Sequence, residues 1–250
     1  MSVSDSAAPN SEKDWIRDAW TLLRKDVRAE LRTKTALSSV GIFAFASLLL
    51  MGLATLTLKE TRAHDFLRNQ DFNAWTDPSK LGLLWTLLCF AAFAGLSHSF
   101  VHEEEAGTVM ALRLTTSAAA VYAGTLTFNV LLLMAVALIV TPAYMVMTGM
   151  QSGPWLVFIM MMLSGCLGLG GAATIVAALA AKARGAGALF GAIGLPLITV
   201  FLLLLLNAAR TLYNADALAL QYVKDIGGLF SYGILLIAVS SFTFKFVWED

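Results

Sequence analysis

Long apolar runs alternate with short polar segments along most of the 250-residue chain. Six of these runs contain about 20 residues or more, which is the length that a helix needs to cross a lipid bilayer. The pattern therefore predicts an all-α, polytopic membrane protein with a six-span transmembrane domain over residues 35–250. Pro142 and Pro196 fall inside the third and fifth runs, where we expect them to kink the helices. We place the six spans at residues 37–58, 81–101, 120–148, 155–181, 186–206 and 226–246.

A more polar segment precedes the first span. Residues 1–13 contain no apolar core of the kind that marks a signal peptide, and we expect them to be disordered. Residues 14–34 show the period of an amphipathic helix. Such a helix lies in the membrane surface, with its basic side toward anionic lipid head groups. Its apolar half is formed by Trp15, Ile16, Ala19, Leu22, Leu23, Val27 and Leu31, and its basic half by Arg17, Arg24, Lys25, Arg28 and Arg32.

Two acidic residues interrupt the apolar half of this predicted interfacial helix. Asp26 and Glu30 fall among its apolar positions when the residues are placed on a helical wheel. Their position predicts that part of the apolar half packs against protein and not against lipid.

The composition agrees with a membrane protein. Hydrophobic residues make up 58% of the chain and charged residues only 14%, whereas a soluble domain carries about 25% charged residues. No Asp, Glu, Lys or Arg occurs from Leu114 to Ala181. The formal net charge of zero argues against a nucleic-acid partner.

The loops between the spans differ in their content of Lys and Arg. Eleven of the 17 lie in the N-terminal segment, the second and fourth loops and the C-terminal tail, and six lie in the other loops. Because Lys and Arg accumulate on the cytoplasmic side, this imbalance predicts that both termini are cytoplasmic.

Residues that usually carry chemistry are sparse. The phosphate-binding pattern G-x-x-x-x-G-K-[ST] is absent, so we expect no ATP hydrolysis by this chain. No charged residue lies in the middle of a span, which argues against the interpretation as a secondary transporter. A membrane enzyme would need polar groups that converge at one membrane depth, and the sequence shows no such groups. Cys89 and Cys166 are expected to be small apolar residues. His98 and His102, four residues apart, suit either a divalent ion or solvated polar side chains.

Small residues at spacings of four indicate close helix packing. Ser164, Gly168 and Ala172 form one such series, and Gly187 and Gly191 form a second. The spacing does not say whether the partner helix belongs to the same chain or to another.

The segment 102–117, between the second and third spans, has an unusual pattern. Glu103, Glu104 and Glu105 follow the second span, where the helix dipole disfavours acidic residues, so we expect basic partners for them. Gly107 and Thr108 then suit the end of one helix and the cap of the next. Residues 115–118 are expected to cap the third span. Between the caps lies a short helix with Arg113 and the apolar residues Val109, Met110, Leu112 and Leu114.

A helix this short is not stable alone. Two interpretations of it remain: it fills a groove in a soluble partner, or it is a connector that lies on lipid. The basic interfacial helix, six spans and short cytoplasmic helix resemble the permease subunits of type-2 ABC exporters. In that family the short helix is the coupling helix, which docks on a separate ATPase.

The resemblance narrows to the haem exporter protein B (CcmB) family of the cytochrome c maturation system. That family has a motif similar to F-x-x-[DE]-x-x-D-G-x-L. This chain has Phe100, Glu103, Ala106, Gly107 and Val109 at those positions, so alanine replaces the second acid and valine replaces leucine. The stretches AWTLLRKDVRAELRTK and GLPLITVFLLLL also resemble this family.

The resemblance implies a non-catalytic permease subunit in the bacterial inner membrane. It implies a homodimer that pairs with an ATP-binding subunit, a haem-handling membrane protein and a haem chaperone. ATP would bind to the partner, and the complex would handle haem, with no cofactor or metal on this chain alone. ATPase coupling would fall to the three glutamates and to most of the residues that follow them, namely Glu103, Glu104, Glu105, Gly107, Thr108, Val109, Met110, Leu112, Arg113 and Leu114. The alternative is a type-2 permease for another substrate, such as a lipid, a polysaccharide or a drug.

Overall fold

The computed structural model describes residues 12–66, 77–105, 116–182, 195–214 and 216–249. These ranges form helices joined by short turns, without a β-strand among them, which confirms the all-α prediction for this part of the chain. The helices are α1 (Glu12–Thr33), α2 (Thr35–Phe66), α3 (Asp77–Glu105), α5 (Ala118–Thr148), α6 (Trp155–Lys182), α8 (Leu195–Leu212) and α9 (Ala219–Glu249).

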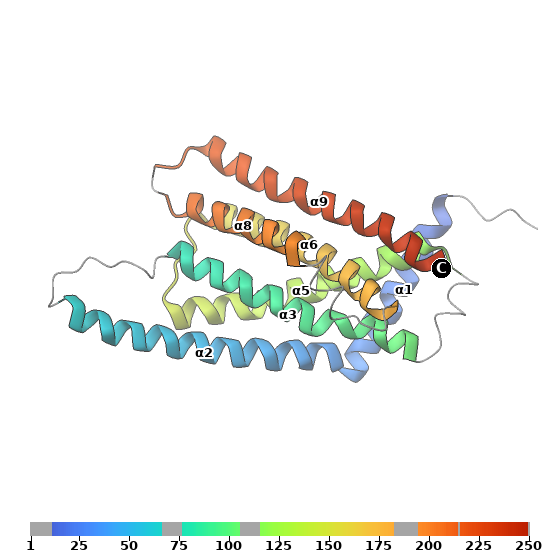
Figure 1. Cartoon of the computed structure of the whole chain (residues 1–250), viewed down its shortest axis with the longest axis horizontal. Helices are drawn as coiled ribbons and strands as arrows, with labels where there is room; N and C mark the ends of the chain where they lie inside the picture. Colours follow the sequence, from blue (N-terminus) through green and yellow to red (C-terminus); the bar gives the residue numbers. More distant parts are fainter. Residues whose placement is uncertain (1–11, 67–76, 106–115, 183–194, 215, 250) are drawn as a thin grey trace, which may run out of the picture.

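Six helices, α2 to α9, form an elongated bundle and alternate in direction (Figure 1). The short helix α1 lies across one end, and Lys34 separates it from α2 with a positive φ of 55°. The C-terminus of α9 lies at the same end, which we call the α1 end. The opposite end, which we call the distal end, contains the C-termini of α2, α5 and α8 and the N-termini of α3, α6 and α9.

The span count is only partly settled by these helices. Among the described residues, α5, α6 and α9 contain stretches that are long and apolar enough to cross a membrane. A fourth stretch qualifies if α1 and the start of α2 count as one bent span, whereas Pro196–Leu212 of α8 is shorter. Five predicted spans lie inside α2, α3, α5, α6 and α9, and 195–206 of the fifth span lies in α8. The count of six therefore stays a prediction.

Helix α8 contains residues 195–206 of the predicted fifth span and continues to Leu212. The part beyond residue 206 is amphipathic, with Ala208 and Ala209 buried and Arg210 exposed. Pro196 directly follows Leu195, the first described residue of α8. Because the residues before Leu195 lie outside the described part of the chain, the kink at this proline stays a prediction.

Helix α6 is the centre of the packing because its glycines admit side chains from four neighbouring helices. A Cβ on Gly165 would collide with Trp85 of α3, and one on Gly168 would collide with Phe201 of α8. A Cβ on Gly170 would lie 2.6 Å from Val130 of α5, and a Cβ on Gly171 would lie 2.9 Å from Ile237 of α9. Close packing of this kind drives helix association in membranes, where the lipid is as apolar as the side chains.

The small residues predicted to mediate packing act within this chain. Ser164, Gly168 and Ala172 are all buried, and a Cβ on Gly233 of α9 would lie 3.5 Å from the Gly168 Cα atom. Gly187 and Gly191 lie outside the described residues. The predicted packing role of the first series is therefore confirmed, with its partner helices in the same chain.

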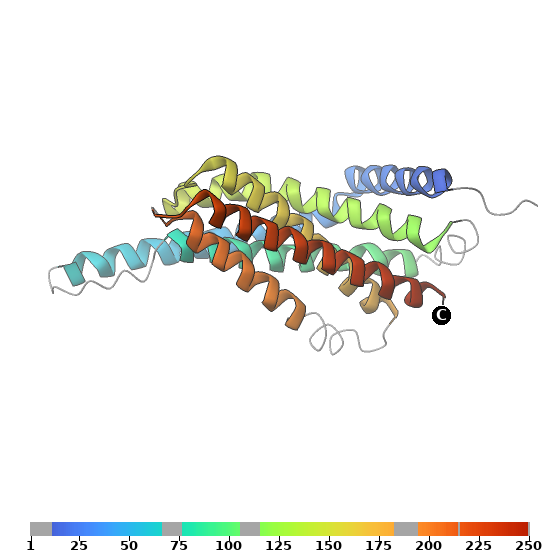
Figure 2. The same cartoon turned by 90° about the horizontal axis from the view of Figure 1, so that it is seen from above.

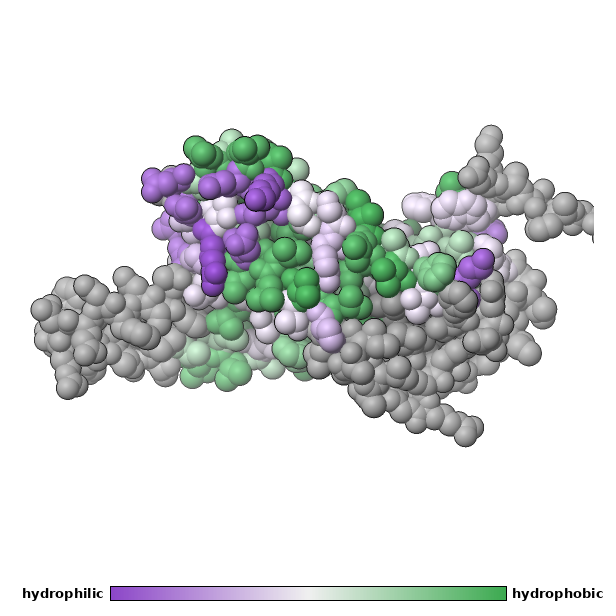
Figure 3. All heavy atoms as spheres, turned by 45° about the horizontal axis from the view of Figure 1, so that its top comes forward, coloured by the Kyte–Doolittle hydropathy of each residue, from purple (hydrophilic) through white to green (hydrophobic). Residues whose placement is uncertain are grey.

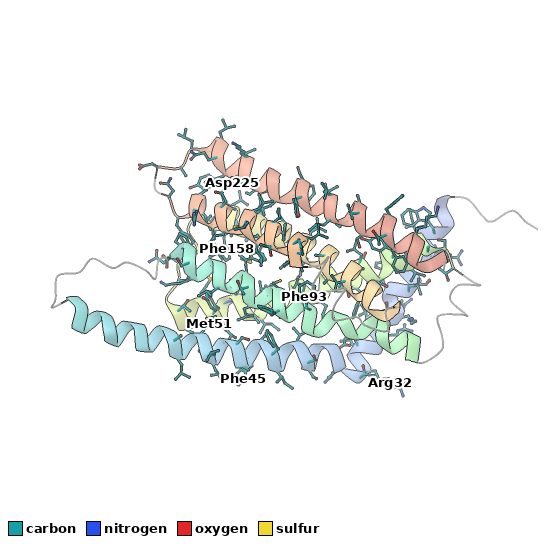
Figure 4. All side chains as sticks on the ribbon, in the orientation of Figure 1. Arg32, Phe45, Met51, Phe93, Phe158 and Asp225 are labelled. Atoms are coloured by element: carbon teal, nitrogen blue, oxygen red, sulfur yellow. The ribbon has the colours of Figure 1, made fainter. Side chains whose placement is uncertain are left out.

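The outer surface of the bundle is strongly apolar. Phe45 of α2 is exposed and points away from the other helices (Figure 4). Over α8 and α9, Figure 3 shows a hydrophobic surface along the middle of the bundle and hydrophilic side chains gathered at the distal end. The exposed polar residues of that end include Asn207, Arg210, Asn214, Gln221 and Lys224. An apolar middle with a polar end is typical of a protein embedded in lipid.

Candidate coupling region

The predicted coupling segment is bounded by two helix ends at the α1 end of the bundle. Helix α3 ends at Glu105, so Glu103, Glu104 and Glu105 form its last turn, as expected from the sequence. Their side chains lie outside the described part of the chain, and so do residues 106–115. The coupling helix with Gly107, Thr108, Val109, Met110, Leu112, Arg113 and Leu114, and the expected basic partners of the glutamates, therefore stay predictions.

The segment is followed at once by α5. Ser117 has extended backbone angles, with φ −74° and ψ 149°, and its Oγ accepts a hydrogen bond of 3.3 Å from the Ala120 amide. This bond satisfies one of the N–H groups that a helix leaves free at its start. The expected cap of the third span is therefore present.

Helix α1 packs against these first turns of α5. Leu23 is buried, and Leu22 contacts a cluster formed by Val121, Tyr122 and Phe244, so that α1, α5 and α9 meet at one point. The close approach needs a glycine on α5, because a Cβ on Gly124 would lie 3.1 Å from the Ala19 carbonyl oxygen. In Figure 2, α1 lies on the side of the bundle opposite to α8.

The acidic residues of α1 lie on the side that packs against protein. Asp26 and Glu30 are half-buried, as are Ala19 and Leu22, and Lys25 Nζ lies 3.4 Å from Asp26 Oδ1. The structure thus confirms that part of the predicted apolar half of α1 contacts protein.

The rest of α1 divides into two exposed strips. Arg17, Arg24, Lys25, Arg28 and Arg32 are all exposed, as the wheel predicts, and Arg32 points out of the bundle at the α1–α2 junction (Figure 4). The second strip is apolar and includes Trp20, which the sequence analysis did not assign to the apolar half and which is 66% exposed. Its other members are Ile16 and Leu31. The two strips together suit a helix that lies at the lipid surface.

A substitution at Gly124 tests whether α1 is held by α5. We expect Gly124→Leu to displace α1, because overpacking costs ~1–3 kcal/mol, while Gly41→Leu on α2 meets nothing within 4 Å and serves as the control. The measurement is maleimide labelling of a Leu23→Cys variant, whose side chain is buried in the docked state. Labelling should become about tenfold faster with Gly124→Leu. Equal rates in the two variants would show that α1 is held elsewhere.

Two polar residues inside the bundle converge, contrary to the sequence analysis. The Asn129 Nδ2 group of α5 donates a hydrogen bond of 2.8 Å to Thr174 Oγ1 of α6, and both side chains are fully buried. Thr174 Oγ1 in turn donates to the Gly170 carbonyl at 2.7 Å. The pair escaped detection because its members are 45 positions apart in the sequence and neither is charged.

The structure shows, for its described residues, which of the residue types that could bind a metal ion come together. The described residues contain no group of three or more His, Cys, Asp or Glu side chains that could hold a metal ion. Cys89 and Cys166 are free and buried in the apolar core, as expected of small apolar residues. His98 and His102 lie on α3, but their side chains are outside the described residues, so both interpretations of this pair stay open.

The distal end has a polar cluster that the sequence analysis did not identify. Lys80 Nζ lies 2.8 Å from Asp77 Oδ1 at the start of α3, and the Lys80 carbonyl accepts a hydrogen bond of 2.8 Å from Tyr144 of α5. Tyr213, just after α8, donates to the Gln151 carbonyl in the α5–α6 turn. Burial, and secondarily the Asp77 charge, raises the pKa of Tyr213 far above its usual range, so this phenol stays a donor.

A second polar contact of the distal end joins α8 to α9. Asn207 Nδ2 donates to Asp225 Oδ1 at 3.2 Å, and Asp225 lies on the side of α9 that faces α8 (Figure 4). The spacing of Asp77 and Lys80 was the one local signal for the distal cluster, since the other partners are far apart in the sequence.

The comparisons with known proteins agree with this arrangement. The family described as ABC-2 type transporter matches residues 17–205, which is about three quarters of the chain and extends from α1 into α8. No curated protein matches the chain at a significant level. Since the match covers the interfacial helix, the predicted coupling segment and most of the bundle, the chain belongs to the ABC-2 type transporter family.

Proposed function

We propose that this protein is the membrane permease subunit of an ABC transporter that serves cytochrome c maturation. It would couple ATP hydrolysis by a separate ATPase to haem delivery, or to release of the haem-loaded periplasmic chaperone. The role as membrane subunit of an ABC transporter follows from the family match over residues 17–205. The haem assignment is the narrower part of the proposal.

One observation carries the haem assignment. Phe100, Glu103 and Gly107 keep the spacing of the motif in haem exporter protein B. Phe100 and Glu103 lie in the last two turns of α3, and Gly107 follows that helix by two positions, at the end of the bundle where α1 packs on α5. The haem assignment is supported further by the resemblance of the α1 sequence and of the start of α8 to the same family.

The partners follow from the class of transporter. ABC-2 membrane domains generally pair with an ATP-binding subunit, and this chain has no phosphate-binding loop of its own. We further propose a homodimer, a haem-handling membrane protein and a haem chaperone as partners, with ATP on the ATPase. The chain would itself be non-catalytic and would hold no haem alone.

The proposed orientation places the α1 end in the cytoplasm and the distal end in the periplasm. Eleven Lys and Arg residues on one side against six on the other support this direction. An even number of spans also agrees with the fact that α1 and the C-terminal end of α9 lie at the same end of the bundle. We therefore propose six spans in the bacterial inner membrane, with both termini cytoplasmic.

Purification from the native membrane tests the proposal. We expect the affinity-tagged chain to co-purify with an ATP-binding subunit and a haem-containing membrane protein, and we expect its deletion to abolish haem-stained c-type cytochromes. A catalytically inactive ATPase partner should give the same loss of cytochromes.

The alternative, an ABC-2 permease for a lipid, a polysaccharide or a drug, predicts a different result. An ATPase would still co-purify, but no haem protein would, and c-type cytochromes would remain at their normal level after deletion. That result would contradict the haem assignment and leave the role as an ABC membrane subunit in place.

A further inference from the structure

The exposed sides of α8 and α9 change from apolar to polar at different depths. Asn207 and Asp225 lie at one common depth, because Asn207 Nδ2 of α8 donates to Asp225 Oδ1 of α9 at 3.2 Å. From this depth to the distal end, the exposed residues of α8 and of the turn after it are polar, namely Asn207, Arg210, Asn214 and Asp216. Large apolar residues of α9 and of the turn stay exposed on the distal side of Asp225, namely Val223, Leu220 and Leu218. Figure 3 shows both kinds of surface at the distal end.

The exposed apolar residues of α9 are spread over a length that can cover the hydrocarbon core of a bilayer. We call them the α9 strip, which consists of Leu220, Val223, Phe230, Ile234, Leu235, Val239 and Phe242. The 22 steps from Leu220 to Phe242 correspond to about 33 Å of helix, and the hydrocarbon core is about 30 Å thick. Acyl chains that cover the whole strip reach Leu220, which lies about 7.5 Å beyond Asp225. They therefore pass the depth at which α8 turns polar.

Two cations lie at this uneven boundary without an ion pair among the described residues. Arg210 of α8 and Lys224 of α9 are both exposed. Lys80, a third described cation of the distal end, is paired with a carboxylate at 2.8 Å. The Asp225 carboxylate next to Lys224 accepts its hydrogen bond from Asn207 instead. Guanidinium and ammonium groups bind phosphate oxygens, so the two cations suit an anionic head group.

A phospholipid fits the combination of these two surfaces. Its head group suits the exposed polar end of α8, and its acyl chains suit the α9 strip. Gly227 and Gly228 leave the outer side of α9 open between Val223 and Phe230, because a Cβ on either glycine would meet nothing within 4 Å. The strip also continues from the distal end into the apolar middle of the bundle, whereas a soluble protein could reach only its distal end.

We propose that the distal ends of α8 and α9 bind one anionic phospholipid, with its phosphate between Arg210 and Lys224 and its acyl chains along the α9 strip. The lipid is a resident of the leaflet at the distal end and not a transported cargo. The site belongs to the membrane-embedded chain itself and does not rest on the haem assignment.

Spin labels test the depth of the α9 strip on the full chain in lipid nanodiscs. A label is placed at Leu220 or at Val223, which are 76% and 67% exposed, after Cys89 and Cys166 are replaced by alanine. Oxygen concentrates in hydrocarbon and a nickel chelate stays in water, so both labels should collide preferentially with oxygen. A label at the exposed Asn214 is the control and should collide preferentially with the nickel chelate. Labels at Leu220 and Val223 that behave like the one at Asn214 would overturn the proposal and leave the strip open to a soluble protein.

A fluorophore at Val223 tests the selectivity of the site. Quenching by brominated phosphatidylglycerol is compared with quenching by brominated phosphatidylcholine, which gives the relative affinity for the two lipids beside the label. Each Lys or Arg near an anionic membrane surface strengthens the attraction by about fivefold. The unsubstituted Arg210 and Lys224 should therefore give a preference for phosphatidylglycerol of about fivefold or more, and Arg210→Gln with Lys224→Gln should lower it to about one.

Two control variants separate charge from other effects. Arg32→Gln removes an exposed cation at the α1 end and should leave the preference unchanged. Arg210→Lys with Lys224→Arg keeps both charges and should keep the preference. A ratio near one in the unsubstituted chain, or a preference that survives the two glutamine substitutions, would overturn the phosphate site. The depth measurement needs neither charge variant, so it decides the position of the strip even if one of them does not fold.

The outcomes are distinct from those of the proposed function, since neither ATPase nor haem is present in the nanodiscs. Phosphatidylglycerol selectivity in a chain that co-purifies with no haem protein would contradict the haem assignment and leave the lipid site supported. Loss of the lipid site would leave the proposed partners untouched.

Discussion

Replacing Gly168 by leucine should lower the melting temperature of the purified protein by about 6–12 °C. The side chain would enter the space of the Phe201 ring, which is fully buried. Phe201 cannot withdraw easily, because its ring stacks on Tyr232 with centroids 5.9 Å apart. Overpacking of such a site costs about 3 kcal/mol, and each 1 kcal/mol shifts the melting temperature by about 2–4 °C in a chain of this size.

Gly227→Leu on α9 is the matched control for this prediction. Gly227 is exposed, and a Cβ on it meets nothing within 4 Å. Leucine favours a helix over glycine by roughly 0.8 kcal/mol, so the control should be neutral or stabilising. Adding Phe201→Ala to Gly168→Leu should restore part of the lost stability. Equal melting temperatures for the Gly168 and Gly227 variants would show that α6 is not the centre of the packing.

The central position of α6 explains why its packing could be predicted only in part. The spacing of Ser164, Gly168 and Ala172 indicated a close helix approach, because residues four apart share one face of a helix. The spacing carries no information about the partner. The structure supplies Phe201 and Gly233 from two helices that are distant in the sequence.

Helix positions were the most predictable feature of the fold, because the length and polarity of a segment are local properties. The same reasoning does not give the full length of α8, which continues to Leu212 past the end of its apolar run. A helix can continue past the apolar run when one side of it stays packed, as Ala208 and Ala209 do here. Only tertiary contacts contain that information.

The candidate site was predicted where charge or helical period gave a signal. Asp26 and Glu30 correctly indicated a protein contact on α1, because acidic side chains on the apolar side of a helix would be unfavourable in lipid. The tyrosine bonds gave no such signal, because their partners are main-chain carbonyls, which every residue has. Tyr122 and Ile237, for example, are 115 positions apart.

Substitution of Leu112 by aspartate should reduce binding of the ATPase by about tenfold or more, while the chain still inserts in the membrane. Leu112 lies in the predicted coupling helix, outside the described residues, between the ends of α3 and α5. Removing a leucine side chain from a packed site costs roughly 2–5 kcal/mol, and 1.4 kcal/mol already corresponds to a factor of ten in affinity. The measurement is co-purification of the ATPase, with membrane expression of the variant measured in parallel.

Leu112→Met is the control, because it conserves volume and apolar character and should keep most of the binding. Gly107→Val should resemble Leu112→Asp if Gly107 adopts the left-handed turn expected of it, since valine is strained in that conformation. Full ATPase binding and normal cytochrome c maturation with Leu112→Asp would make the segment a connector that lies on lipid.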